Sequence, residues 1–236
     1  MGCPHYLAKT GMEFRCEDGD AGPAAWMACH FSPYGTGLSN LPRTLPPDSL
    51  LMVDDITPIH GHDFMFIGEQ LKACVEALKC RGVLLDFQRP GYSECEKLAN
   101  HLFEVLPCPV AVSSLYGKDF PGPVLLPPLP FCSSLEAYLD GWKGREVWLE
   151  TALDGEAVTL TESGAATSPL PRFSPAENGF EEESLHCHYK AAVFEDRITF
   201  TLWRTGKDSE GLLEEAKALG VTLALGLYQE WRNSKP

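Results

Sequence analysis

Carboxylate and amide side chains follow two apolar runs of the chain that have the character of buried strands. Asp54 and Asp55 end the run LLMVDD, and Asp86 and Gln88 stand in the run GVLLDFQRP. Side chains two positions apart in a strand point to the same side, so Asp86 and Gln88 are expected to face one side together. A carboxylate among apolar residues needs a partner. Arg89 could be a purely structural partner of Asp86, or Asp86 could line a pocket.

Other polar and aromatic residues fall at the ends of further expected strands. A carboxyl group such as that of Glu150 can act as a general acid or base. An aromatic side chain beyond the last expected strand, such as Trp231, could line a ligand pocket. The candidates for substrate contact, beside Asp54 and Asp55, are Tyr116, Tyr228 and Trp231.

Groups of histidine and cysteine offer an alternative, a metal site. His60 and His62 of the segment HGHD lie just after Asp54 and Asp55, and a common strand edge could bring them to Asp86. No HExxH helix or closed cysteine set supports this alternative, so we predict neither metal nor cofactor. Two further groups are expected to be ordinary packing and surface residues: Cys3, His5 and Cys16, and His186, Cys187 and His188.

Composition narrows the classes of partner. The 236 residues carry a formal net charge of −14, with 44% hydrophobic and 22% charged residues. A nucleic-acid-binding protein needs a positive footprint, and an anionic membrane surface would also be repelled. We therefore expect neither nucleic acid nor membrane as a partner, whereas a neutral or cationic small-molecule ligand is left open.

Cysteine usage and the first residues suggest a compartment. Nine cysteines are scattered through expected helices and strands, which indicates reduced thiols. The segment MGCPHYLAKTGMEFRC has neither the apolar run nor the basic region of a signal peptide, and no 18-residue apolar stretch occurs. We expect a cytoplasmic protein.

Apolar strands alternate with amphipathic helices along the chain, which is typical of a parallel sheet covered on both faces. Helices are expected at residues 66–81, 93–106, 134–142 and 209–219. Strands are expected at residues 26–31, 50–55, 83–87, 108–114, 124–129, 146–153 and 221–228, with a hairpin at 185–203. Residues 161–183 are expected to be a loop, either merely exposed or a lid over a site.

This pattern predicts an α/β protein with one domain over residues 1–236. The architecture is a (β/α)8 TIM barrel, degenerate or shortened, with a β-hairpin insertion before the last helix and strand. Seven strands can be counted, and the eighth would fall at residues 35–47 (GTGLSNLPRTLPP). A doubly wound open sheet is the alternative, although no glycine-rich phosphate loop follows any strand.

The order of three segments resembles glycoside hydrolase family 18, the chitinase-like barrels. LLMVDDITP resembles the family's third strand, and GVLLDFQRPGY resembles its fourth-strand signature DGxDxDxE. The stretch VFEDRITFTLWRTGKDSEGLLEEAKALGVTLALGLYQEW resembles the late hairpin, helix and last strand. The resemblance covers roughly residues 50–231 and implies a sugar site at the barrel mouth, with Trp231 at its floor.

The signature is only partly kept. Gly82 and Asp86 match it, whereas Arg81 and Leu84 replace two aspartates and Gln88 replaces the catalytic glutamate. In the family that glutamate protonates the leaving oxygen, while the neighbouring aspartate orients the substrate's acetamido group, which is the nucleophile. An amide cannot supply that proton, and general acid catalysis typically contributes about 10²- to 10⁴-fold.

Three functions follow as hypotheses. The first is a catalytically impaired relative that binds an amino-sugar-containing glycan at the barrel mouth. The second is an active glycosidase or other hydrolase with a relocated acid, Glu150 or Asp55. The third is a metal-dependent barrel hydrolase that uses His60, His62, Asp54 or Asp55.

Overall fold

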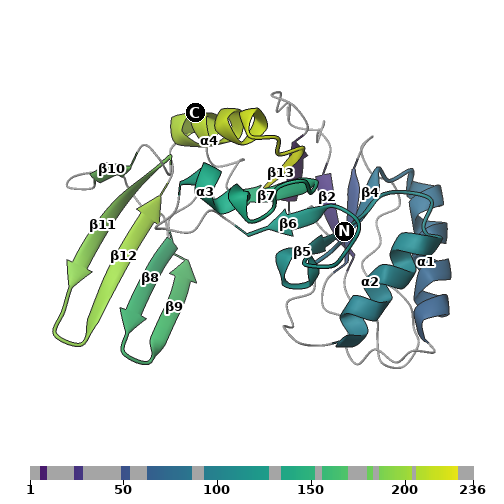
Figure 1. Cartoon of the computed structure of the whole chain (residues 1–236), viewed down its shortest axis with the longest axis horizontal. Coiled ribbons are helices and arrows are strands. Elements are labelled where there is room, and N and C mark those ends of the chain that lie inside the picture. Colours follow the sequence, from purple (N-terminus) through teal and green to yellow (C-terminus); the bar gives the residue numbers. More distant parts are fainter. Residues whose placement is uncertain are drawn as a thin grey trace.

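A computed structural model of the chain combines a closed barrel with an inserted antiparallel sheet (Figure 1). It describes residues 6–9, 24–28, 49–53, 63–86, 93–127, 134–151, 156–169, 180–182, 186–203 and 206–227. The inserted sheet lies on one side of the barrel, and the helix pair α1 and α2 lies on the opposite side.

Eight strands close the barrel in the order β1-β13-β7-β6-β5-β4-β3-β2. Their bounds are β1 Tyr6–Lys9, β2 Ala24–Ala28, β3 Leu50–Val53, β4 Gly82–Leu85, β5 Val110–Ser113, β6 Val124–Leu126, β7 Val147–Thr151 and β13 Leu223–Leu227. The seven strands from β2 to β7 and β13 pair in parallel. The predicted α/β class and the seven-strand count are therefore confirmed.

The eighth strand departs from the prediction in place and in direction. It is β1, in the N-terminal segment, and it pairs antiparallel with both β13 and β2. The expected position, residues 35–47, lies outside the described residues; among the residues that are described, β1 takes the eighth place in the barrel. Four residues with one aliphatic pair (YLAK) leave too short a periodic pattern to identify β1 from the sequence.

Four α-helices are present in the part of the chain that the structure describes, and all four were expected. They are α1 Asp63–Leu78, α2 Ser93–Val105, α3 Leu135–Asp140 and α4 Gly206–Ala218. The connection from β5 to β6 holds only the short 3-10 helix η1, Ser114–Tyr116. The barrel therefore departs from strict strand–helix alternation at this step, as a shortened barrel would.

Alternation along the strands divides the apolar residues between two environments. One buried cluster contains strand residues only, which places it inside the barrel: Leu50, Met52, Leu84, Ala111, Leu125, Trp148, Leu223 and Leu225. Their neighbours in sequence belong to two other clusters, in which the strands pack against helices. Every strand from β3 to β7 is thus buried on both faces, which explains its nearly continuous apolar sequence.

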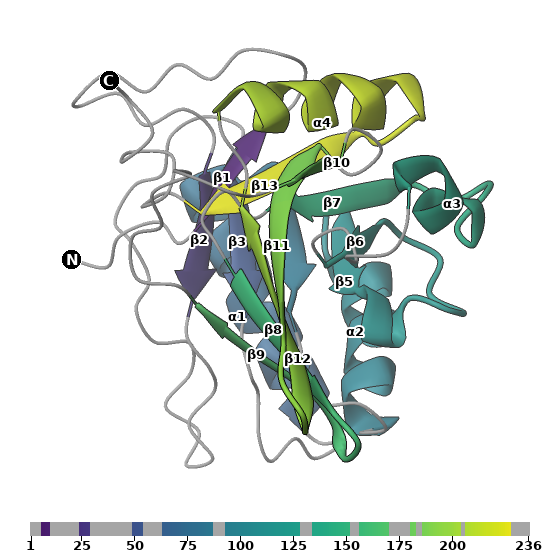
Figure 2. The same cartoon turned by 90° about the vertical axis from the view of Figure 1, so that its left-hand side faces the viewer.

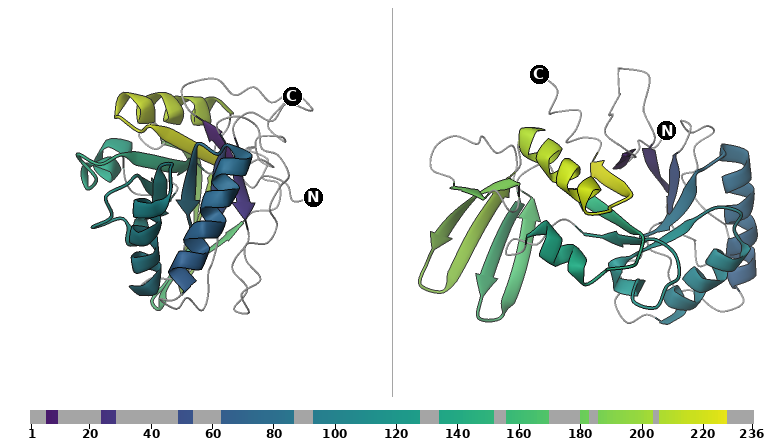
Figure 3. Two further views of the ribbon diagram at one scale, coloured as in Figure 1. Left: turned by 90° about the vertical axis from the view of Figure 1, so that its right-hand side faces the viewer. Right: turned by 45° about the horizontal axis from the view of Figure 1, so that its top comes forward.

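The helices α1 and α2 lie side by side and cover strands β3 to β5 (Figure 3). Leu71 of α1 and Leu98 of α2 are fully buried against Val83 and Val110. Helix α2 begins at Ser93 with two acidic residues in its first turn, which suits the positive end of the helix dipole.

The segment between β7 and α4 forms a five-stranded antiparallel sheet in the order β10-β11-β12-β8-β9. Its strands are β8 Glu156–Thr161, β9 Gly164–Pro169, β10 Phe180–Glu182, β11 Cys187–Val193 and β12 Arg197–Trp203. The predicted hairpin is β11 and β12. The prediction that residues 161–183 are loop is wrong for β9 and β10, whose Gly, Ala, Ser and Glu residues gave no strand signal but pair with stronger neighbours.

The inserted sheet is held to α4 at the start of β11. Cys187 is 1% exposed and packs with Leu212 and Ala216 of α4. On either side of it, His186 pairs with Glu215 through Nε2, and the Nε2 atom of His188 lies 3.1 Å from Asp208 Oδ2. Figure 2 shows the sheet in front of the barrel with α4 above it. Cys187 thus serves packing, as expected, whereas His186 and His188 each pair with a carboxylate of α4.

Among the described residues, no helix is both long enough and apolar enough to cross a membrane.

Candidate functional site

Asp86 stands at the carboxyl end of β4 and continues that strand by one position. Its backbone N–H donates a 2.9 Å hydrogen bond to the carbonyl of Val53 in β3. Leu84, two residues earlier, belongs to the interior cluster. Because strand side chains alternate, the carboxylate of Asp86 lies on the interior side at the mouth of the barrel. It is half-buried.

Two more polar side chains reach the same end of the barrel by the same alternation. Ser113 follows the interior residue Ala111 by two positions, and Glu150 follows the interior residue Trp148 by two. Ser113 is 6% exposed, whereas Glu150 is half-buried. The carboxyl ends of parallel strands carry the functional residues of barrel enzymes. The structure therefore brings Asp86, Ser113 and Glu150 to one rim, and we call these three residues the mouth group.

Tyr138 of α3 extends this polar region toward the outside of the barrel. Its hydroxyl donates a 3.1 Å hydrogen bond to the carbonyl of Pro127, directly after β6. Burial and, to a smaller extent, the negative charge of Glu150 together raise the pKa of Tyr138 to about 12. The phenol is therefore a hydrogen-bond donor at neutral pH, close enough to Glu150 to feel its charge.

Sequence reasoning missed Ser113 and Tyr138. Ser113 had a usable signal, because it stands two residues beyond an interior position of β5. Tyr138 had none, because its relation to Glu150 depends on how α3 packs beside β6 and β7.

Tyr116, a predicted substrate contact, lies elsewhere. It is 9% exposed and belongs to the cluster packed beneath α1 and α2. This position is on the outer face of the barrel wall, so Tyr116 does not belong to the mouth group.

Several predicted site residues lie outside the described residues. They are Asp54, Asp55, His60, His62, Gln88, Tyr228 and Trp231, and also Cys3, His5 and Cys16. Their roles stay predictions. Across the described ranges, no group of three or more His, Cys, Asp or Glu side chains has the geometry to hold a metal ion.

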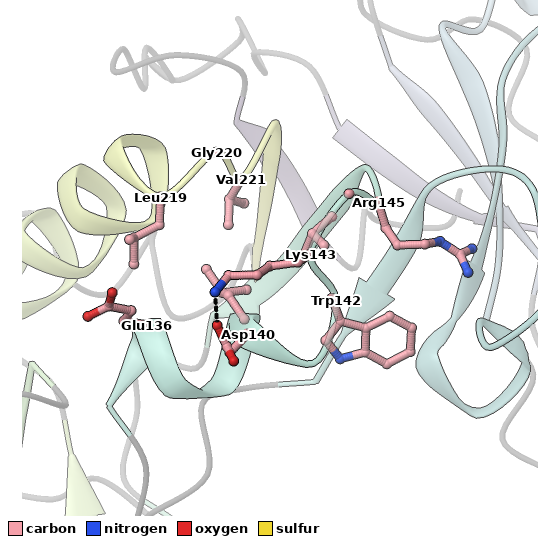
Figure 4. A pocket seen from close by; sticks show the side chains of 11 residues that line it. Glu136, Asp140, Trp142, Lys143, Arg145, Leu219, Gly220 and Val221 are labelled. Atoms are coloured by element: carbon pink, nitrogen blue, oxygen red, sulfur yellow. Dashed lines mark ion pairs between the residues drawn. The ribbon is translucent and has the colours of Figure 1, made fainter.

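A cavity of about 210 Å³ lies at the opposite end of the barrel, where β7 and β13 begin (Figure 4). Its wall includes Leu139, Asp140 and Lys143 on one side and Leu219 and Val221 on the other. Lys143 pairs with Asp140 across its edge, and the Lys143 side chain is 79% exposed. The amino ends of barrel strands usually serve stability, so we assign this cavity no ligand.

Arg145 also belongs to that end but points away from the pair of Lys143 and Asp140. Its guanidinium donates to the carbonyls of Lys118 at 2.9 Å, of Phe120, and of Gly122 at 3.4 Å. Arg145 therefore fixes the loop between η1 and β6, which replaces a helix in this barrel.

The fold is similar to those of two solved structures. The first is the "putative sporulation-specific glycosylase ydhD" of Bacillus subtilis, with a TM-score of 0.60 and 8% identity over 94% of this chain and 95% of that chain. The second is the spore cortex-lytic enzyme SleL of Bacillus cereus, with a TM-score of 0.50 and 10% identity over 78% of this chain and 58% of that chain. At these identities the similarity concerns the fold alone.

No protein-family model matches the chain, and no curated protein matches it in sequence.

Proposed function

We propose that this protein binds a glycan containing N-acetylated amino sugars at the barrel mouth and has lost most or all hydrolytic activity. The observation that carries the proposal is the mouth group, which presents two carboxylates and a hydroxyl at the carboxyl ends of β4, β5 and β7. The similarity of the fold to a glycosylase and to a cortex-lytic enzyme supports a sugar as the ligand.

The chemistry of the mouth group suits sugars. Carboxylates accept hydrogen bonds from sugar hydroxyls and from acetamido N–H groups, and hydrogen bonds to a charged group are the stronger kind. A neutral glycan also carries no charge that a protein of net charge −14 would repel.

Gln88 is the reason to propose binding without efficient cleavage. It lies two residues beyond Asp86, where glycoside hydrolase family 18, which the chain resembles, has its catalytic glutamate. The N–H groups of a side-chain amide can donate hydrogen bonds, but they are not acidic enough to transfer a proton to a leaving oxygen. Loss of general acid catalysis typically costs about 10²- to 10⁴-fold in rate.

The test is calorimetric titration of the full chain with an N-acetylglucosamine oligomer. We expect wild-type binding and a loss of about tenfold or more in affinity for Asp86→Asn and for Glu150→Gln, since each replaces a charged acceptor. Glu104→Gln is the matched control, because this exposed carboxylate lies in the last turn of α2, away from the mouth.

The proposal fails if wild type does not bind the oligomer. It also fails if both mouth variants, folded by circular dichroism, bind as tightly as Glu104→Gln.

A second candidate, hydrolysis with a relocated acid, is favoured by one observation. Glu150 is half-buried, and Tyr138, whose pKa its charge raises, stands beside it as a neutral donor. If Glu150 is the general acid, the wild-type protein should hydrolyse the substrate slowly. Glu150→Gln should then abolish this hydrolysis, and Glu104→Gln should not. Release of a fluorescent aglycone measures it, and the same residual rate in all three proteins would exclude this candidate.

A further inference from the structure

The free end of the inserted sheet exposes a continuous apolar row. Val193, Ile198 and Leu160 are direct partners across β11, β12 and β8, so their side chains stand next to one another on one face. They are 75%, 36% and 39% exposed. We call Leu160, Val193 and Ile198 the tip patch.

The tip patch continues a face that is already used for packing. Cys187 and Val193 are six residues apart in β11, so they point to the same face. At the base of the sheet Cys187 packs on α4, whereas no residue that the structure describes covers Val193 at the tip. At ~3.3 Å per residue, the tip lies roughly 20 Å from this anchor.

The tip is also rigidly built. The backbone N–H of Phe194 donates a 2.8 Å bond to the carbonyl of Arg197, which closes a two-residue turn. The Arg197 guanidinium lies 4.3 Å from the centre of the Phe194 ring and pairs with Asp196 at 3.2 Å. Because the turn is held on both sides, the apolar side chains keep a fixed outward position.

Acidic residues border the patch. The turn between β11 and β12 carries Glu195 and Asp196, and the turn between β8 and β9 carries Glu162; all three are exposed. These turns are adjacent, because Arg197 of β12 pairs with Thr161 of β8 (Figure 1). Arg197 is the one basic residue in the two turns and is already paired with Asp196.

We propose that the tip patch is a docking surface for a partner protein that presents apolar side chains bordered by lysine or arginine. Charge complementarity selects this occupant. A second copy of the chain would bring two acidic tips together, and an anionic membrane would be repelled by the same turns. This surface is separate from the mouth group, so it stands whether or not a glycan binds there.

The probe is a synthetic amphipathic helix with leucine on one face and lysine on the other, and fluorescence anisotropy follows its binding to the full chain. We expect Val193→Thr with Ile198→Thr to weaken binding by about tenfold, since threonine keeps the strand propensity but removes apolar surface. Glu162→Gln with Glu195→Gln should weaken it several-fold and reduce its salt dependence.

The control for the apolar variant is Met65→Thr, at a position 69% exposed on α1 at the other side of the barrel. Equal affinity of the tip variants and this control would overturn the proposal. So would equal binding of a helix in which glutamate replaces lysine. Concentration-dependent dimers, or co-sedimentation with anionic phosphatidylserine vesicles, lost in the tip variant would overturn it in favour of those occupants.

Discussion

The backbone N–H of Asp86 donates to the carbonyl of Val53 at 2.9 Å, one position beyond Leu85, the last residue of β4. This bond keeps the strand conformation through Asp86, so alternation from the interior Leu84 places the carboxylate at the mouth of the barrel. The position of the mouth group depends on this extension.

Placing a carboxyl group at residue 88 should produce cleavage, if Gln88 stands at the acid position of a sugar site as proposed above. We expect Gln88→Glu to hydrolyse an N-acetylglucosamine oligomer at a rate about 10²-fold or more above wild type, because it regains a proton donor. Chromatography of the products measures the rate. Gln70→Glu on α1 is the matched control, and equal rates in both variants would count against a former acid position at residue 88.

The phenol of Tyr138 should lose its proton at a higher pH than a free tyrosine does, and the free energy of unfolding should decrease at alkaline pH. Its pKa is raised to about 12 from a usual value of 10, so the unfolded chain loses this proton first. The folded state therefore binds more protons between about pH 10 and pH 12, and the free energy of unfolding decreases as pH rises through that range.

The measurement for Tyr138 is urea unfolding at pH 9 to 11, together with the phenolate absorbance. Tyr138→Phe should lessen the alkaline decrease, and Glu150→Gln should lower the pKa of Tyr138 because it removes the negative charge. A Tyr138→Phe protein with an unchanged pH profile would contradict the prediction.

Arg145 should be irreplaceable by lysine. Its planar guanidinium serves the carbonyls of Lys118, Phe120 and Gly122 at once, which a single ammonium cannot do. We expect Arg145→Lys to lower the free energy of unfolding by about 1–3 kcal/mol in urea titrations. Lys143→Gln, at the exposed pair with Asp140, should leave the urea midpoint unchanged; a similar loss there would argue against the role of Arg145.

Gly122 should tolerate no side chain. A Cβ atom there would lie 2.4 Å from the carbonyl oxygen of Val110 and 2.7 Å from Cε1 of Phe120. We expect Gly122→Ala to destabilise by about 1–3 kcal/mol. Gly141→Ala is the opposite case, because its Cβ meets nothing within 4 Å and the backbone is helical; it should gain ~0.4–1 kcal/mol. Thermal unfolding of both variants decides the point.

Strong local patterns made most of the fold predictable. Burial could be predicted directly from the apolar stripes of α1 and α2 and from the apolar runs Leu50–Val53 and Val110–Ser113. By contrast, β1 and β9 exist because partners hold them, and a short segment paired to a distant strand carries little periodicity of its own.

The same distinction applies to the candidate site. Asp86 and Glu150 could be predicted because alternation within one strand determines where each points. Tyr138 could not, because its phenol comes near Glu150 only through the packing of α3. Tyr116 stands near a strand end in sequence, yet η1 turns its ring under the helices.

The pairing of β1 with both β2 and β13 has a consequence for biosynthesis. Tyr6 and Leu227 are partners, so the barrel cannot close until β13 has been synthesised and has left the ribosomal exit tunnel. Until β13 has emerged, β7 presents an open edge where β13 will later pair. Contacts between positions so far apart in the sequence also slow folding. We therefore expect the nascent protein to need chaperones more than the segment of β3 to β5 with α1 and α2 would need them by itself.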